Sequence, residues 1–152
     1  MSALTAFDGT QVSAIAEEVF AALIDGEPGH LYLTAPTSPS DLVDPLYAWV
    51  DMHADVSGRV LLSVDTGTAH ELARALLRMG AEEPVEDEDL VDAFGEVANV
   101  VGGNLKALLP VQGTLTLPRV SATPPSDEGT TLVDRIPLAW RGRSFDISIW
   151  QL

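Results

Sequence analysis

The sequence predicts an α+β fold of two layers, in which long helices pack on a largely antiparallel β-sheet. Apolar residues recur every three or four positions in two long segments, which is typical of helices with one buried face, whereas elsewhere they alternate with polar residues, as in strands. The strands follow one another as hairpins instead of alternating with helices, and this favours antiparallel pairing. The element order indicates two pseudo-symmetric halves, whose long helices begin near residues 12 and 87.

The composition is that of one soluble globular domain covering residues 1–152, with 46% hydrophobic and 20% charged residues. The formal net charge of −15 would repel phosphate backbones and anionic lipid headgroups, so nucleic acids and membranes are poor partners. The absence of cysteine excludes disulfides and thiol nucleophiles. Residues 1–9 lack the features of a secretory signal, and Lys106 interrupts the most apolar stretch, so we expect a cytoplasmic protein.

In the first half, the spacing predicts a helix over residues 12–23, which the glycine- and proline-containing segment 25–29 ends. A short strand is expected at 30–34, a proline-rich loop at 36–45, and strands at 46–52 and 59–64. Thr68 and Glu71 have the spacing of a capping box. The helix that they would begin buries three apolar residues, Leu72, Leu76 and Met79.

In the second half, an acidic segment at residues 82–89 leads into a long helix over 87–109, which Pro110 ends. Alternating residues then predict strands at 111–117, 132–140 and 144–149, with a turn at 141–143 between the last two. The final strand ends in an apolar segment that no charged residue follows, made of Phe145, Ile147, Ile149 and Trp150. An unprotected edge of this kind invites pairing, so a homodimer is expected.

The second long helix carries the clearest functional pattern. One stripe is apolar and is expected to be buried: Leu90, Phe94, Val97, Val101, Leu105 and Leu108. The opposite stripe holds Asp92, Glu96, Asn99, Gly103 and Lys106. A carboxylate and a carboxamide three residues apart lie side by side on a helix, so Glu96 and Asn99 can act on one small target together. Three glycines, Gly95, Gly102 and Gly103, indicate either close packing of the helix or close approach of a partner.

Residues 92–106, with the sequence DAFGEVANVVGGNLK, resemble the signature of the CheC/CheX family of chemotaxis phosphatases. That signature is Asp or Ser, three residues, Glu, two residues and Asn, followed by Gly-Asn-x-Lys. Residues 56–64 and 69–79 also resemble the first half of the family. The sequence departs from the pattern at the proline expected beyond the Asn, because Ala122 occupies that position and Pro118 comes earlier.

The resemblance implies a CheX-like protein phosphatase that hydrolyses the phospho-aspartate of a response regulator. Glu96 would contact a lysine of the phosphorylated receiver domain, and Asn99 would orient the attacking water. Asp92, Gly103 and Lys106 would contact the partner from the same stripe. No cofactor of its own is implied, because the Mg²⁺ would belong to the response regulator.

Two further expectations follow from the residues. The histidines, His30, His53 and His70, lack metal-ligand spacing, so the sequence predicts no metal site. Aligning the two long helices places Glu18 opposite Glu96 but Ala21 opposite Asn99, which predicts one active site per chain. The alternative function is a non-catalytic module that binds a receiver domain or serves in an assembly.

Overall fold

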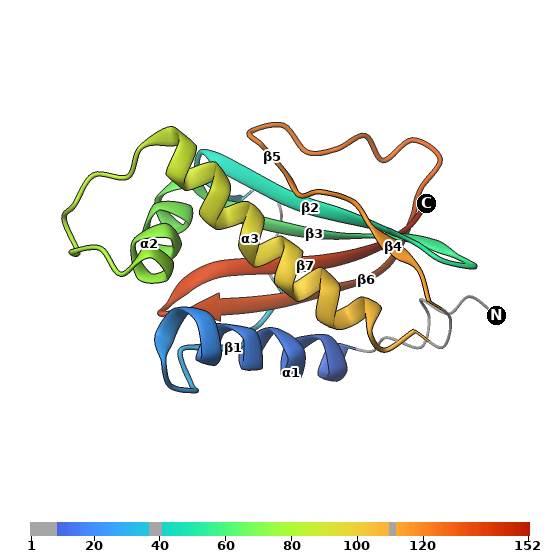
Figure 1. The fold of residues 1–152 in the computed structure, drawn as a ribbon, viewed down its shortest axis with the longest axis horizontal. Helices are drawn as coiled ribbons and strands as arrows, with labels where there is room; N and C mark the ends of the chain where they lie inside the picture. The colour runs from blue at the N-terminus through green and yellow to red at the C-terminus, as the bar shows by residue number, and fades with distance from the viewer. Residues whose placement is uncertain (1–8, 37–40, 110–111) are drawn as a thin grey trace.

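The computed structural model describes residues 9–36, 41–109 and 112–152, and it places the helices on one face of a seven-stranded antiparallel sheet (Figure 1). The helices are α1 (Gly9–Phe20), which a π-helical turn η2 (Ala21–Asp25) continues, α2 (Thr66–Leu77) and α3 (Asp87–Lys106). The strands are β1 (Leu31–Leu33), β2 (Pro45–His53), β3 (Ser57–Asp65), β4 (Thr114–Leu115), β5 (Arg119–Ser121), β6 (Thr131–Trp140) and β7 (Arg143–Gln151). The predicted α+β class is confirmed.

The sheet has the strand order β1-β6-β7-β3-β2-β4, and β5 pairs with the same edge of β2 as β4 does. Alternation along the strands sends one set of apolar residues toward the helices, as Ala48, Val50 and Met52 show in β2. Helix α3 crosses this face diagonally (Figure 1). The core therefore lies in a single layer between the helices and the sheet.

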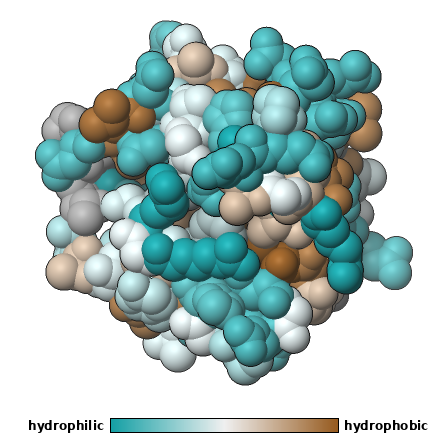
Figure 2. Space-filling model, turned by 90° about the vertical axis from the view of Figure 1, so that its left-hand side faces the viewer, coloured by the Kyte–Doolittle hydropathy of each residue, from teal (hydrophilic) through white to brown (hydrophobic). Residues whose placement is uncertain are grey.

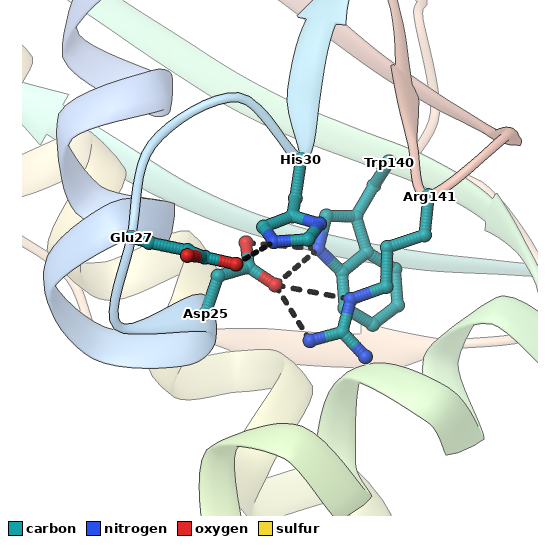
Figure 3. A network of polar contacts seen from close by, with 5 residues as sticks. All are labelled: Asp25, Glu27, His30, Trp140 and Arg141. Carbon is teal, nitrogen blue, oxygen red and sulfur yellow. Dashed lines mark hydrogen bonds and ion pairs between the residues drawn. The ribbon is translucent and has the colours of Figure 1, made fainter.

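Asp25 joins the end of the first helical segment to the β6–β7 hairpin (Figure 3). Its carboxylate, whose side chain is 1% exposed, accepts hydrogen bonds from the indole Nε1 of Trp140 and from the guanidinium of Arg141. That guanidinium also lies 4.6 Å from the centre of the Trp140 ring. Next to this cluster, His30 Nε2 lies 2.8 Å from Glu27 Oε1, but the Glu27 side chain is 69% exposed. The buried carboxylate fixes the predicted turn after the first helix.

Several predicted boundaries are wrong. Helix α2 begins at Thr66, so Thr68 is buried inside the helix and forms no capping box, and Glu71 pairs with Arg74 instead. Helix α3 ends at Lys106, three residues before the predicted end, and this leaves Leu108 45% exposed.

The strand predicted at residues 111–117 is reduced to the two residues of β4. Leu117 is 86% exposed, so the apolar alternation there does not mark a buried face. Val111, the first residue of this predicted strand, and Pro110, which was predicted to end the helix, lie outside the described residues.

The edge that was expected to support a homodimer does not exist. Strand β7 pairs with β3 on one side and with β6 on the other, so its apolar residues belong to the centre of the sheet. Phe145, Ile147 and Ile149 are fully buried. The homodimer itself stays a prediction.

No helix in the described part of the chain combines the length and the apolar character needed to cross a membrane.

Candidate functional site on helix α3

Helix α3 holds the candidate site because its two stripes have opposite surroundings. Acidic residues occupy its first turn, where they complement the positive end of the helix dipole. The predicted apolar stripe is buried from Leu90 to Leu105, and Phe94, Val101 and Leu105 have no exposed surface. Packing of this stripe on the sheet fixes the rotation of the helix, so the opposite stripe must face outward.

The predicted site residues lie together on that outward stripe. Asp92 and Glu96 are exposed, whereas Asn99, Gly103 and Lys106 are half-buried. Neither Glu96 nor Asn99 makes a side-chain hydrogen bond or ion pair with any residue that the structure describes. An exposed carboxylate and a half-buried carboxamide, one helical turn apart, are thus available to a partner or to water.

A segment that we call the strap, residues 112–121, lies along one side of the stripe. At the N-terminal end of the stripe, a Cβ on Gly95 would lie 3.5 Å from Pro118. Farther along, a Cβ on Gly103 would lie 3.9 Å from Leu115, and Lys106 Nζ donates a 3.1 Å hydrogen bond to the Gly113 carbonyl oxygen. The contacts run in opposite order along the two segments, so the strap is antiparallel to α3. It forms a wall beside the stripe that carries Asn99.

Strand β2 holds the strap in place from behind. β4 pairs with Met52 and His53, while β5 pairs with Tyr47 to Trp49. Between these pairings, the Asp51 backbone N–H donates to Thr116 Oγ1 at 2.9 Å, and the Thr116 N–H donates to the Asp51 carbonyl at 2.8 Å. The strap is therefore fixed to the sheet on one side and to α3 on the other.

Close packing explains one of the three glycines of α3, Gly102. A Cβ on Gly102 would lie 2.3 Å from Val50 Cγ2, so the helix could not approach β2 with any larger residue there. Gly95 is buried beside Pro118 and Val120, but a Cβ there would make only ordinary contacts with them, at 3.5 and 3.6 Å. Gly103 is half-exposed on the predicted stripe, and it alone of the three has surface that a partner could approach.

The structure shows what occupies the position at which the sequence departs from the expected proline. Ala122, at the position where the proline was expected, is exposed beyond the end of β5. Pro118 is the residue that packs against α3, at Gly95. The chain thus has a proline beside the site, four residues earlier than the resemblance led us to expect.

Sequence reasoning missed the strap and the role of Lys106 within it. The ammonium group of Lys106 is hydrogen-bonded to the strap, and its predicted contact with a partner stays a prediction. The glycine at position 113 is the one feature of the sequence that marks the close approach of the strap to β2. A Cβ there would lie 2.4 Å from the His53 carbonyl oxygen. The pairing of Gly113 with a residue so distant in sequence could not be read from local pattern.

The surroundings of the site are acidic. The segment that leads into α3 exposes Glu82, Glu83, Glu86, Asp87, Glu88 and Asp89. The end of the molecule that holds α2 and the beginning of α3 is mostly hydrophilic (Figure 2). A partner that docks here with lysine or arginine side chains would meet a complementary charge.

Comparison with known proteins gives one matching family. The model of the chemotaxis phosphatase CheX family matches residues 46–126, which include β2 from its second residue, β3, the helices α2 and α3, and the strap. No curated protein matches the chain significantly.

Solved structures with the same fold include several chemotaxis proteins. CheX from Desulfovibrio desulfuricans is 17% identical, with a TM-score of 0.66 over 93% of this chain and 96% of that one. CheX from Vibrio vulnificus is 19% identical, with a TM-score of 0.68 over 93% of each chain. A CheX–CheY–BeF3–Mg²⁺ complex from Borrelia burgdorferi is 16% identical, with a TM-score of 0.68 over 95% of this chain and 97% of that one. At these identities the likeness shows the fold alone.

Proposed function

Because the chain belongs to the CheX family of chemotaxis phosphatases, we propose that it hydrolyses the aspartyl phosphate of a response regulator receiver domain. The observation that carries this proposal is the pair Glu96 and Asn99, which is outward-facing and has no partner among the described residues. The partner class is supported by the Borrelia burgdorferi complex, in which CheX is found with CheY, Mg²⁺ and BeF3, a stand-in for a phosphoryl group.

Asn99 is the residue proposed to position the water. A carboxamide is not a general base, but an acyl phosphate has a carboxylate as its leaving group and needs mainly a water held in line with the bond that breaks. The water oxygen forms a new bond to phosphorus, the bond from phosphorus to the aspartyl oxygen breaks, and the electron pair leaves with the carboxylate. The proton of the water passes to the released phosphate or to solvent.

Glu96 is proposed to dock the partner. Its exposed carboxylate lies one turn before Asn99, where it can accept a charge-assisted hydrogen bond from a lysine of the receiver. Asp92, a further turn toward the N-terminus, extends the acidic side of the same stripe. The Mg²⁺ that neutralises the phosphoryl oxygens is assigned to the receiver.

The test is single-turnover dephosphorylation of a labelled phosphorylated receiver with increasing concentrations of this protein. We expect the loss of label to accelerate and to saturate. Asn99→Ala serves as the matched variant, because it removes the carboxamide from an exposed stripe and leaves the core intact. A receiver that binds tightly but loses phosphate no faster than alone would instead indicate the non-catalytic module.

A further inference from the structure

The face of the sheet opposite the helices contains a cavity of about 440 Å³ that the proposed phosphatase site does not use. Its floor consists of side chains from the strands β2, β3, β6 and β7, and the segment 124–130 covers it from outside. We propose that this cavity binds a small, uncharged aromatic molecule that carries an N–H donor, such as a carboxamide or a lactam.

The shape and the walls of the cavity suit an aromatic ring. Its volume lies within the range of about 300–1,000 Å³ that small-molecule sites occupy in proteins. Tyr47, Leu61 and Trp150 supply apolar surface from the sheet, while Pro124 and Pro125 supply it from the covering segment. A flat ring between these residues would bury apolar area on both of its faces.

Asp146 supplies the polar recognition. Its side chain is 6% exposed and lines the cavity. Arg135 Nη2 donates to Asp146 Oδ2 at 2.5 Å, but Oδ1 is buried and has no hydrogen-bond partner among the described residues. A buried carboxylate oxygen without a donor is costly, so a ligand N–H that reaches it would be favourable.

The charges around the cavity favour an uncharged ligand over an ion. Arg59 is neutralised by Asp51 through two hydrogen bonds, and Arg135 is neutralised by Asp146. A carboxylate ligand would therefore meet no free cation there, and it would approach a chain with a net charge of −15. Asp127 also lines the cavity, but it is exposed to solvent, whereas an ammonium group that reached Asp146 would lie beside the guanidinium of Arg135, which repels it.

The experiment uses benzamide as the probe, with benzoate and benzylamine as its anionic and cationic counterparts of similar size. The readout is the indole N–H resonance of Trp150, which donates to Ser148 at the cavity. Trp140, whose indole donates to Asp25 on the other face of the sheet, is the internal control. We expect benzamide to shift Trp150 in a saturable manner, leave Trp140 unchanged, and bind at least about tenfold more tightly than either ion.

Two variants test the recognition. Asp146→Asn should lower the affinity for benzamide, and the Trp140 resonance reports whether that variant is still folded. Ser63→Leu fills the cavity from β3 and keeps the Arg135–Asp146 pair, so it should abolish the shift without the loss of a charge.

The proposal is overturned if no probe shifts Trp150, if benzoate or benzylamine binds as well as benzamide, or if Trp140 shifts equally. It is also overturned if the Trp150 signal changes with protein concentration alone, because a second copy of the chain would then occupy this face. None of these readouts depends on phosphatase activity.

Discussion

The ammonium group of Lys106 and the carbonyl oxygen of Gly113 are joined by a 3.1 Å hydrogen bond that connects the last turn of α3 to the strap. Lys106 is the only lysine of the chain. Lys106 therefore holds the wall beside the stripe, and the partner contact that the sequence suggested for it stays a prediction.

Lys106→Met should loosen the strap. Loss of a partly buried hydrogen bond from a charged donor is expected to lower the free energy of unfolding by about 1 kcal/mol, measured by urea denaturation. Amide hydrogen exchange at Thr114 and Thr116 should accelerate more than exchange in β3. Lys106→Arg, which retains a donor, is the control. Unchanged protection of the strap in the methionine variant would contradict this role.

Gly102→Ala should destabilise the protein by about 1–3 kcal/mol, because its Cβ would overlap Val50 and push α3 away from β2. Gly103→Ala is the matched control one residue later. Its Cβ would make only an ordinary contact with Leu115, and alanine favours the helix by up to ~1 kcal/mol, so the unfolding free energy should stay equal or rise. Thermal or urea unfolding of both variants decides the matter, and equal effects would show that the packing argument is wrong.

Asp25→Ala should cost about 1–3 kcal/mol of stability, because the indole N–H of the buried Trp140 would lose its acceptor. Glu27→Ala, two residues away, removes an exposed carboxylate and should change the unfolding free energy by less than about 1 kcal/mol. Chemical denaturation followed by tryptophan fluorescence compares the two. The interpretation fails if the Glu27 variant is the more damaged.

Asn99→Ala and Glu96→Ala should affect different steps of the proposed reaction. The first should lower the maximal rate by about 100-fold while affinity for the phosphorylated receiver stays close to that of the parent, because positioning of water matters mainly in the transition state. The second should raise the protein concentration needed for half-maximal rate by about tenfold, and this increase should be larger at low salt. Single-turnover kinetics at several protein concentrations separates these effects.

The double variant should be less than additive in rate, because both residues serve one geometry. Substantial turnover in Asn99→Ala at saturation would exclude the water-positioning role, or it would reveal a second site in the first half. In the first half, Glu18 is exposed on α1, but Ala21 has no side-chain carboxamide that could position a water.

The homodimer prediction now depends on another edge of the sheet. β1 is the outer strand beside β6, and Tyr32 and Leu33 on it are 43% and 53% exposed. If two chains pair through β1, sedimentation equilibrium at micromolar concentration should give a dimer, and Leu33→Lys should shift the equilibrium toward the monomer. A monomeric mass for the parent chain would end the prediction.

Local pattern predicted the helices and the long strands, because each has a periodic apolar face that one layer of core buries. It also predicted the stripe of α3, since the burial of Phe94, Val101 and Leu105 fixes where Glu96 and Asn99 lie. It failed where pairing is distant. The apolar residues of β7 indicated an exposed edge only because nothing local reveals that β3 pairs beside them.

The strap was missed for the same reason. Its residues, including Leu117, alternate like those of one strand. In the structure they form two short strands, β4 and β5, which pair separately with the same edge of β2. The cavity on the opposite face was also invisible, because it requires Arg135 and Asp146 from neighbouring strands together with the distant prolines of segment 124–130.

The distance between the strap and β2 along the chain has a consequence for the order of folding. The hydrogen bond from Asp51 to Thr116 spans 65 residues, whereas β2 and β3 are joined by a short turn. Closing a long loop costs more chain entropy than closing a hairpin, so the strap should dock after β2, β3 and α3 have come together. We therefore expect pulse-labelling during refolding to show that the amides of β3 are protected before that of Thr116. The strap beside Asn99 should be among the last parts of the sheet to form.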